Sequence, residues 1–122
     1  MSKYKMTLSK ESFKFSCSHF TIFGPDEAER MHGHNYFLSV ELVIQDVNPQ
    51  LGMAFDFNQL KPRIKDVCDR LDEQILIPEK SPFLQIHRTN AEISVRFANK
   101  RYVLPAEDVL LLPLVNISTE EL

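Results

Sequence analysis

The stretch MHGHNY, residues 31–36, decides how this chain folds, together with SCSHF, residues 16–20. The residues that follow it, 36–44, are rich in aromatic and β-branched side chains, which is typical of a strand. Successive side chains of a strand alternate between its two faces. His32 and His34 are two positions apart, so we expect both imidazoles to project from the same face.

A second strand is predicted just upstream. Phe13, Phe15, Cys17 and His19 alternate with polar residues, which indicates a strand with His19 at its end. Two strands joined by about a dozen residues pair naturally in antiparallel fashion.

His19, His32 and His34 could then converge on one point. Three neutral imidazoles that leave a fourth position open are typical of catalytic zinc sites. Two histidines in strand phase also occur without a metal, and the residues alone leave that alternative open. Three of the four histidines fall in this short segment, which favours a zinc site.

Size and composition limit the other classes of function. A chain of 122 residues fits one domain, 1–122, and its net charge of −3 gives no reason to expect nucleic acid or a membrane as partner. The polar sequence at the N-terminus predicts no signal peptide, so we expect a reducing cytoplasmic location. Cys17 and Cys68 do not suggest a disulfide framework, and Cys68 is interpreted as a small core residue.

One amphipathic helix is predicted after the histidine strands. Leu60, Ile64, Val67, Cys68 and Leu71 form one apolar stripe at helical spacing. Two residues are candidates for the N-cap, Asp56 and Asn58. Pro62 lies beyond the first turn, which predicts that the regular helix begins later than Asp56.

The second half of the chain predicts short strands at 83–87 and 93–97, with a turn at 99–101. His87 has no partner in phase with it, so it is interpreted as a surface histidine. The expected class is α+β: an antiparallel sheet with helices packed on one face. At the end, STEE (residues 118–121) is a capping-box pattern that predicts a helix start, yet the sequence stops at Leu122, so we expect a truncated C-terminus.

Several segments in this order and spacing resemble the 6-pyruvoyltetrahydropterin synthase family, which includes the 6-carboxytetrahydropterin synthases and has the tunnelling fold. They are FKFSCSHF (13–20), HGHNY (32–36), GMAFDFNQLK (52–61) and Leu71-Asp72, and the match runs from about residue 10 onward. The resemblance implies zinc bound by His19, His32 and His34, and a homo-oligomer, a trimer or hexamer. It also implies that a further C-terminal helix and strands are missing and would lie beyond residue 122. These strands would carry a glutamate that anchors the pterin ring.

The resemblance implies a zinc-dependent lyase that acts on the side chain of 7,8-dihydroneopterin triphosphate. The bond that this enzyme breaks would be a carbon–oxygen or a carbon–carbon bond. The pterin product would carry a 6-pyruvoyl, 6-carboxy or 6-hydroxymethyl group. In the best-known members, protons are relayed by a cysteine upstream of HGH and by an Asp–His pair in an L-D-H motif.

This sequence departs from that pattern at two places. Ala28 and Asp26 stand four and six residues before His32, where no cysteine is found, and the L-D-H motif reads Leu71-Asp72-Glu73. We therefore expect Glu29 as the proton relay, because one branch of the family carries a glutamate there, with Asp72 and Glu73 as the other catalytic candidates. Desolvation would raise the pKa of the Glu29 carboxyl and make it a better base.

Two alternatives stay open. Cys17 lies on the same strand face as His19 and could supply a thiolate activated by the metal. The chain could also be a catalytically inactive relative that binds zinc and pterin as a binding or assembly module.

Overall fold

The computed structural model describes residues 4–54 and 56–122. Along these residues the elements are one α-helix, one short 3-10 helix and seven strands. Their bounds are β1 Tyr4–His19, β2 His32–Ile44, α1 Phe57–Leu71, β3 Gln74–Pro78, β4 Leu84–Arg88, β5 Glu92–Phe97, β6 Lys100–Pro105, η1 Ala106–Asp108 and β7 Val109–Leu112.

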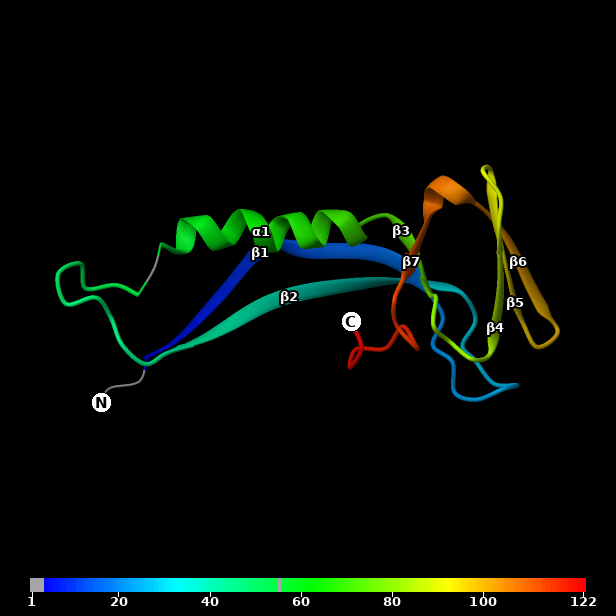
Figure 1. The fold of residues 1–122 in the computed structure, drawn as a ribbon, viewed down its shortest axis with the longest axis horizontal. Coiled ribbons are helices and arrows are strands. Elements are labelled where there is room, and N and C mark those ends of the chain that lie inside the picture. The colour runs from blue at the N-terminus through cyan, green and yellow to red at the C-terminus, as the bar shows by residue number, and fades with distance from the viewer. Residues whose placement is uncertain (1–3, 55) are drawn as a thin grey trace. The chain divides into compact units, whose positions relative to one another are not determined.

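The strands form two sheets (Figure 1). One has four strands in the order β2-β1-β3-β7, and the other has three in the order β4-β5-β6. The prediction that the two histidine-bearing strands lie side by side is confirmed, as is the α+β class. The pairs β1·β3 and β3·β7 are parallel, which the sequence did not predict.

The chain divides into two compact units. Unit 1 contains the described residues up to Phe15 together with Asn35–Asp72, and unit 2 contains Ser16–His34 and Glu73–Leu122. The long strands β1 and β2 each contribute residues to both units.

In unit 1, α1 runs along the strands (Figure 1) and buries part of its predicted stripe. Ile64 and Cys68 are buried on the helix, and Phe13 and Phe15 are buried on β1. Val67 was predicted to lie on the same stripe, but it is 49% exposed because it sits at the edge of the buried face.

The N-terminus of α1 resolves the choice of cap. The Asp56 carboxylate accepts a hydrogen bond of 2.9 Å from the backbone N–H of Asn58, so Asp56 is the N-cap. The helix begins at Phe57, one residue later than Asp56, and continues through Pro62. Pro62 is the sixth residue of the helix, so it lacks the N–H that would donate to the carbonyl of Asn58.

Unit 2 is built on an apolar cluster shared by both sheets. Its buried members are Phe20, Ile22, Ile77, Ile93, Val95 and Phe97. Strand β5 is central: Val95 pairs with Ile86 of β4 and with Tyr102 of β6 in antiparallel register. The two strands predicted at 83–87 and 93–97 are therefore confirmed.

Two further expectations concern turns. The hairpin between β5 and β6 turns at Ala98 and Asn99, slightly before the predicted 99–101, and Ala98 has a positive φ of 49°. At the C-terminal end, the N–H of Glu121 donates to the Ser118 hydroxyl at 3.3 Å, which is the capping contact the sequence predicted. Within the described residues, no helix has the length and apolar character needed to span a membrane.

Candidate metal centre

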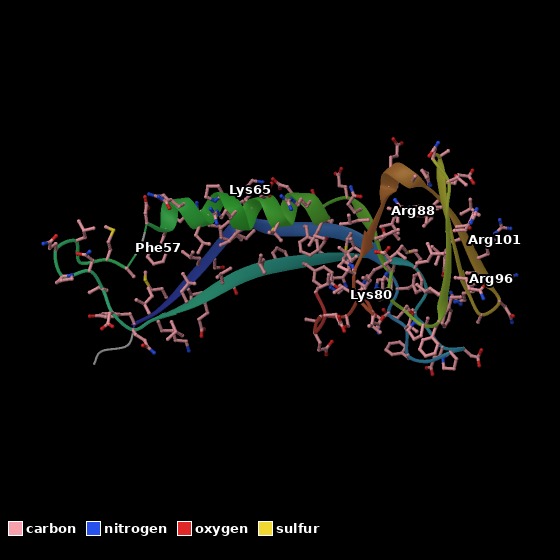
Figure 2. The ribbon with its side chains drawn as sticks, viewed as in Figure 1. Phe57, Lys65, Lys80, Arg88, Arg96 and Arg101 are labelled. Carbon is pink, nitrogen blue, oxygen red and sulfur yellow. The ribbon has the colours of Figure 1, made fainter. Side chains whose placement is uncertain are left out.

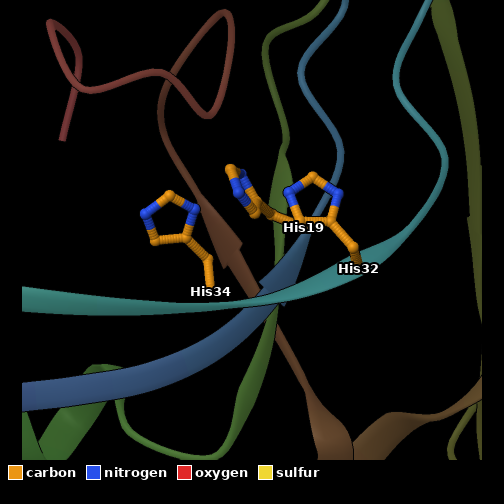
Figure 3. A group of neighbouring side chains, drawn as sticks. All are labelled: His19, His32 and His34. Atoms are coloured by element: carbon orange, nitrogen blue, oxygen red, sulfur yellow. The ribbon is translucent and has the colours of Figure 1, made fainter.

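Three imidazoles meet where β1 ends and β2 begins (Figure 3). His19 is the last residue of β1, and His32 and His34 are the first and third residues of β2. All three belong to unit 2. Each offers a ring nitrogen, and these nitrogens lie within 4.8 Å of one another. The strand phase inferred from the sequence therefore corresponds to a convergence in space.

The rings are close without stacking on one another. Their centroids are 4.8 Å apart for His19 and His32, 5.3 Å for His19 and His34, and 6.3 Å for His32 and His34. His19 is buried, with 3% of its surface exposed, whereas the other two are more open. One side of the group is thus closed by the protein, and the other can receive a ligand.

The backbone fixes the tautomer of one ring. Nδ1 of His32 lies 2.7 Å from the carbonyl oxygen of Arg30. A carbonyl can only accept, so the proton sits on Nδ1 and donates to it. The lone pair of His32 is then on Nε2, and such a hydrogen bond is the usual way in which a metal-binding histidine is oriented.

Burial keeps the second ring neutral. The pKa of His19 is lowered from its ordinary value, first by desolvation and then by the neighbouring His32, while a hydrogen bond with the backbone of Ile117 acts in the opposite direction. A neutral imidazole is the form that binds a metal. The three histidines can therefore hold a metal ion.

Glu29 lies in the loop between β1 and β2 and is tied to the strand end. The N–H of Thr21 donates to Glu29 Oε1 at 2.9 Å, and the N–H of Glu29 donates to the Thr21 carbonyl at the same distance. Hydrogen bonding of the carboxylate with the side chain and then with the backbone N–H of Thr21 lowers the pKa of the Glu29 carboxyl, and the neighbouring imidazoles of His32 and His19 act in the same direction. Desolvation raises this pKa, as expected, but hydrogen bonding to the ionised form outweighs it, so the net change is downward.

Cys17 is placed differently from a reactive thiol. Its side chain is 4% exposed, and burial raises the pKa of the thiol to about 11. Both cysteines are free thiols.

The other two catalytic candidates flank the unit boundary. Asp72 caps the C-terminus of α1 in unit 1, with its N–H donating to the Cys68 carbonyl at 3.0 Å. Glu73 begins the second segment of unit 2 with a positive φ of 58°, and its N–H donates to the Ser16 carbonyl at 2.7 Å. The structure therefore gives Glu73 a backbone role that sequence reasoning did not anticipate.

Sequence reasoning also missed the residues that hold the site's loop. Asn116 forms two hydrogen bonds with the backbone of Ile22: it accepts from the N–H at 3.0 Å and donates to the carbonyl at 2.9 Å. The Thr21 hydroxyl donates to the carbonyl of Ile117, also at 3.0 Å. No local motif marks these contacts, because they join positions more than 90 residues apart.

Known proteins resemble this chain closely. Solved structures of 6-pyruvoyl tetrahydropterin synthase from Plasmodium vivax and Plasmodium falciparum superpose with a TM-score of 0.90, at 30% and 32% identity, over 99% of this chain and 73% of theirs. Two further P. vivax structures carry alanine or cysteine in place of a glutamate designated catalytic in that protein.

Two archaeal relatives, from Methanocaldococcus jannaschii and Pyrococcus abyssi, are each 29% identical over 89% and 88% of this chain, and both are provisionally named 6-carboxy-5,6,7,8-tetrahydropterin synthase. The chain spans 66% and 62% of their lengths. The sequence model of the 6-pyruvoyl tetrahydropterin synthase family matches residues 7–109. The chain therefore belongs to the 6-pyruvoyl tetrahydropterin synthase family.

Proposed function

We propose that this protein is a zinc-dependent lyase of pterin biosynthesis that acts on the side chain of 7,8-dihydroneopterin triphosphate. The observation that carries the proposal is the cluster of His19, His32 and His34, whose ligand atoms lie within 4.8 Å of one another in a chain of this family. Three imidazole nitrogen donors with an open side suit Zn²⁺.

Zinc, when bound, would acidify a hydroxyl of the substrate side chain and stabilise negative charge that develops on oxygen. The chain's own residues hold the metal-binding rings in position. His32 is oriented by the Arg30 carbonyl, and His19 is held by its burial at the end of β1. Both rings are thus set before any ligand arrives, which lowers the cost of assembling the site.

Glu29 is the proposed proton relay. Its lowered pKa keeps the carboxylate ionised at neutral pH, so it is ready to accept a proton. The N–H of Thr21 donates to Oε1 and thereby holds the carboxylate in place. A catalytic glutamate in the P. vivax protein supports this role. Asp72 and Glu73 are proposed to support the relay. The product is a 6-pyruvoyl, 6-carboxy or 6-hydroxymethyl pterin, and the mass of the released pterin distinguishes these three.

The metal is tested first. Purified protein should contain one zinc per chain by mass spectrometry of the metal, and the double variant His32→Ala, His34→Ala should lose it. His87→Ala is the matched control, because His87 is an exposed histidine of β4 outside the cluster. Full zinc content in the double variant would rule out this site.

The relay is tested by Glu29→Gln, which keeps the shape and the hydrogen bond from Thr21 while removing the base. Zinc content should stay at one per chain, and turnover of dihydroneopterin triphosphate should fall by roughly 10²–10⁴-fold. Unchanged turnover would exclude Glu29 as the relay.

A second function is favoured by one observation: the histidine that completes the L-D-H motif is replaced by Glu73. In that case the protein binds zinc and pterin as an inactive relative that serves binding or assembly. It would bind dihydroneopterin triphosphate and turn over no dihydropterin, with or without added zinc. For either function we propose a cytoplasmic homo-oligomer.

A further inference from the structure

The three-stranded sheet of unit 2 has one apolar face and one cationic face. Ile93, Val95 and Phe97 of β5 are buried in the apolar cluster, so the alternate residues of this strand point away from it. Ser94 and Arg96 are among those alternate residues. The register places Gln85 and Arg101 beside Arg96, and His87 beside Ser94.

Two arginines face each other directly on this outer face. Arg96 of β5 pairs with Arg101 of β6 across the antiparallel ladder, and both side chains are exposed (Figure 2). Like charges directly opposite each other destabilise a sheet. None of the ion pairs among the described residues involves either arginine. The nearest acid on this face of β5 is Glu92, four positions from Arg96, which is roughly 13 Å along a strand.

The arginines border a concavity rather than a flat surface. Its volume is about 260 Å³, and its lining includes Gln85, His87, Ser94, Arg96 and Arg101. This is room for a small group and too little for a whole drug-sized ligand. All five side chains can donate hydrogen bonds, and two of them are guanidinium groups, whose planar fork matches phosphate oxygens in pairs.

We propose that this outer face of β4-β5-β6 is a binding site for a small phosphoanion, with Arg96 and Arg101 as its two main ligands. A bound phosphoryl group neutralises the two facing charges, which offsets the repulsion that the free sheet carries. The chain as a whole is negatively charged, so this attraction is local to the patch and does not come from the net field.

The experiment uses tripolyphosphate as the probe, in a calorimetric titration of the metal-stripped protein at low ionic strength. We expect one site per chain, weakened by 150 mM NaCl because the site is open to solvent. The double variant Arg96→Gln, Arg101→Gln should bind at least about 10-fold more weakly, since both charge-assisted contacts are lost. Its melting temperature should be equal to or above that of the parent, because a repulsive pair is removed.

The matched control is Arg88→Gln, Lys100→Gln. These cations belong to the same sheet and the change in net charge is the same, but they pair with Ile93 and Phe97 and so fall on the other strand phase. The control should bind tripolyphosphate within about twofold of the parent. An equal loss in both variants, or no binding by the parent, would overturn the proposal. So would binding that requires added zinc, because it would belong to the histidines.

A second variant separates a loss of the binding groups from a folding defect. Arg96→Lys, Arg101→Lys keeps both charges and loses the planar fork, so an affinity between those of the parent and the glutamine variant is expected. Parent-like affinity in the lysine variant would contradict arginine-specific recognition.

Two sources share this chemistry: the triphosphate of the proposed substrate and a separate phosphorylated metabolite. The first rests on the proposed function. It requires that the glutamine variant lose affinity for dihydroneopterin triphosphate but not for dihydroneopterin. If both pterins bind as in the parent while tripolyphosphate binding is lost, the ligand is a separate one.

Discussion

At the scale of single residues, the loop of the metal centre depends on one amide. Asn116 satisfies both the N–H and the carbonyl of Ile22, a buried residue next to the histidine strand. Asn116→Ala leaves two backbone groups without these partners, so we expect a loss of about 1–3 kcal/mol in the free energy of unfolding. Urea denaturation measures it. Asn90→Ala, at an exposed turn position, is the control and should cost less than about 0.5 kcal/mol.

Cys17 gives a second prediction at this scale. With a pKa of about 11, its thiol is almost wholly protonated at pH 8. Alkylation by iodoacetamide should therefore be on the order of 10²-fold slower in the folded protein than in urea. Cys17→Ala should leave turnover nearly unchanged. Rapid alkylation of the native protein at Cys17, detected by peptide mass, would restore the thiolate alternative.

The same residues show what could be predicted from the sequence. His19, His32 and His34 were predicted because strand alternation is a local rule, and each stands near the others in the chain. Thr21 and Asn116 were missed because their contacts depend on how the C-terminal segment returns to the loop. Asn116 is 94 positions from Ile22, and neither residue type marks such a pairing.

At the scale of elements, substitutions at the start of α1 test which residue is its N-cap. Asp56 accepts from the Asn58 N–H, so Asp56→Ala should cost about 0.5–2 kcal/mol of stability. Asn58 lies within the helix and contributes only its backbone to this contact. Asn58→Ala should therefore be neutral or slightly stabilising in the same urea titration. The reverse order of the two effects would place the cap at Asn58.

Element boundaries were predictable where a local signal exists. Strands β4 and β5 followed from alternation and from turn residues, and Asp56 was one of two predicted caps. The passage of α1 through Pro62 was not predictable, because the buried stripe at Ile64 and Cys68 outweighs the lost N–H. The parallel pairing of β3 with β7 was also missed. It joins Ile75 to Val109 across the intervening strands β4, β5 and β6, and only tertiary packing decides it.

At the scale of the whole molecule, stability should depend on pH. The folded pKa of His19 lies below its ordinary 6.5, so below that pH the unfolded chain binds the proton more readily and folding is weakened. The folded pKa of Glu29 lies below its ordinary 4.5, so its contribution is present above 4.5 and is lost as the pH falls through the folded value. Both effects have the same sign.

The metal-free protein should therefore melt at a lower temperature at pH 5.5 than at pH 7.5, and at a lower temperature still near pH 4. Scanning calorimetry across this range measures the slope. His19→Gln should flatten the part between pH 7.5 and 5.5, because glutamine does not titrate. A melting temperature that rises on acidification to pH 5.5 would contradict the burial argument.

Assembly is the remaining property of the whole molecule. Strand β2 exposes Phe37 by 75% and Val43 by 64%, and these residues share one face because they are an even number of positions apart. Large apolar side chains on an open sheet face indicate contact with another protein surface. We propose that this face joins copies of the chain, as the trimers and hexamers implied by the family resemblance require.

Light scattering of the full-length protein should then give a multiple of the chain mass. Phe37→Asp should lower that mass, whereas Val103→Asp, at a half-exposed position of β6, should not. A monomeric parent, or a Phe37→Asp variant with the parent's mass, would show that β2 is not the interface.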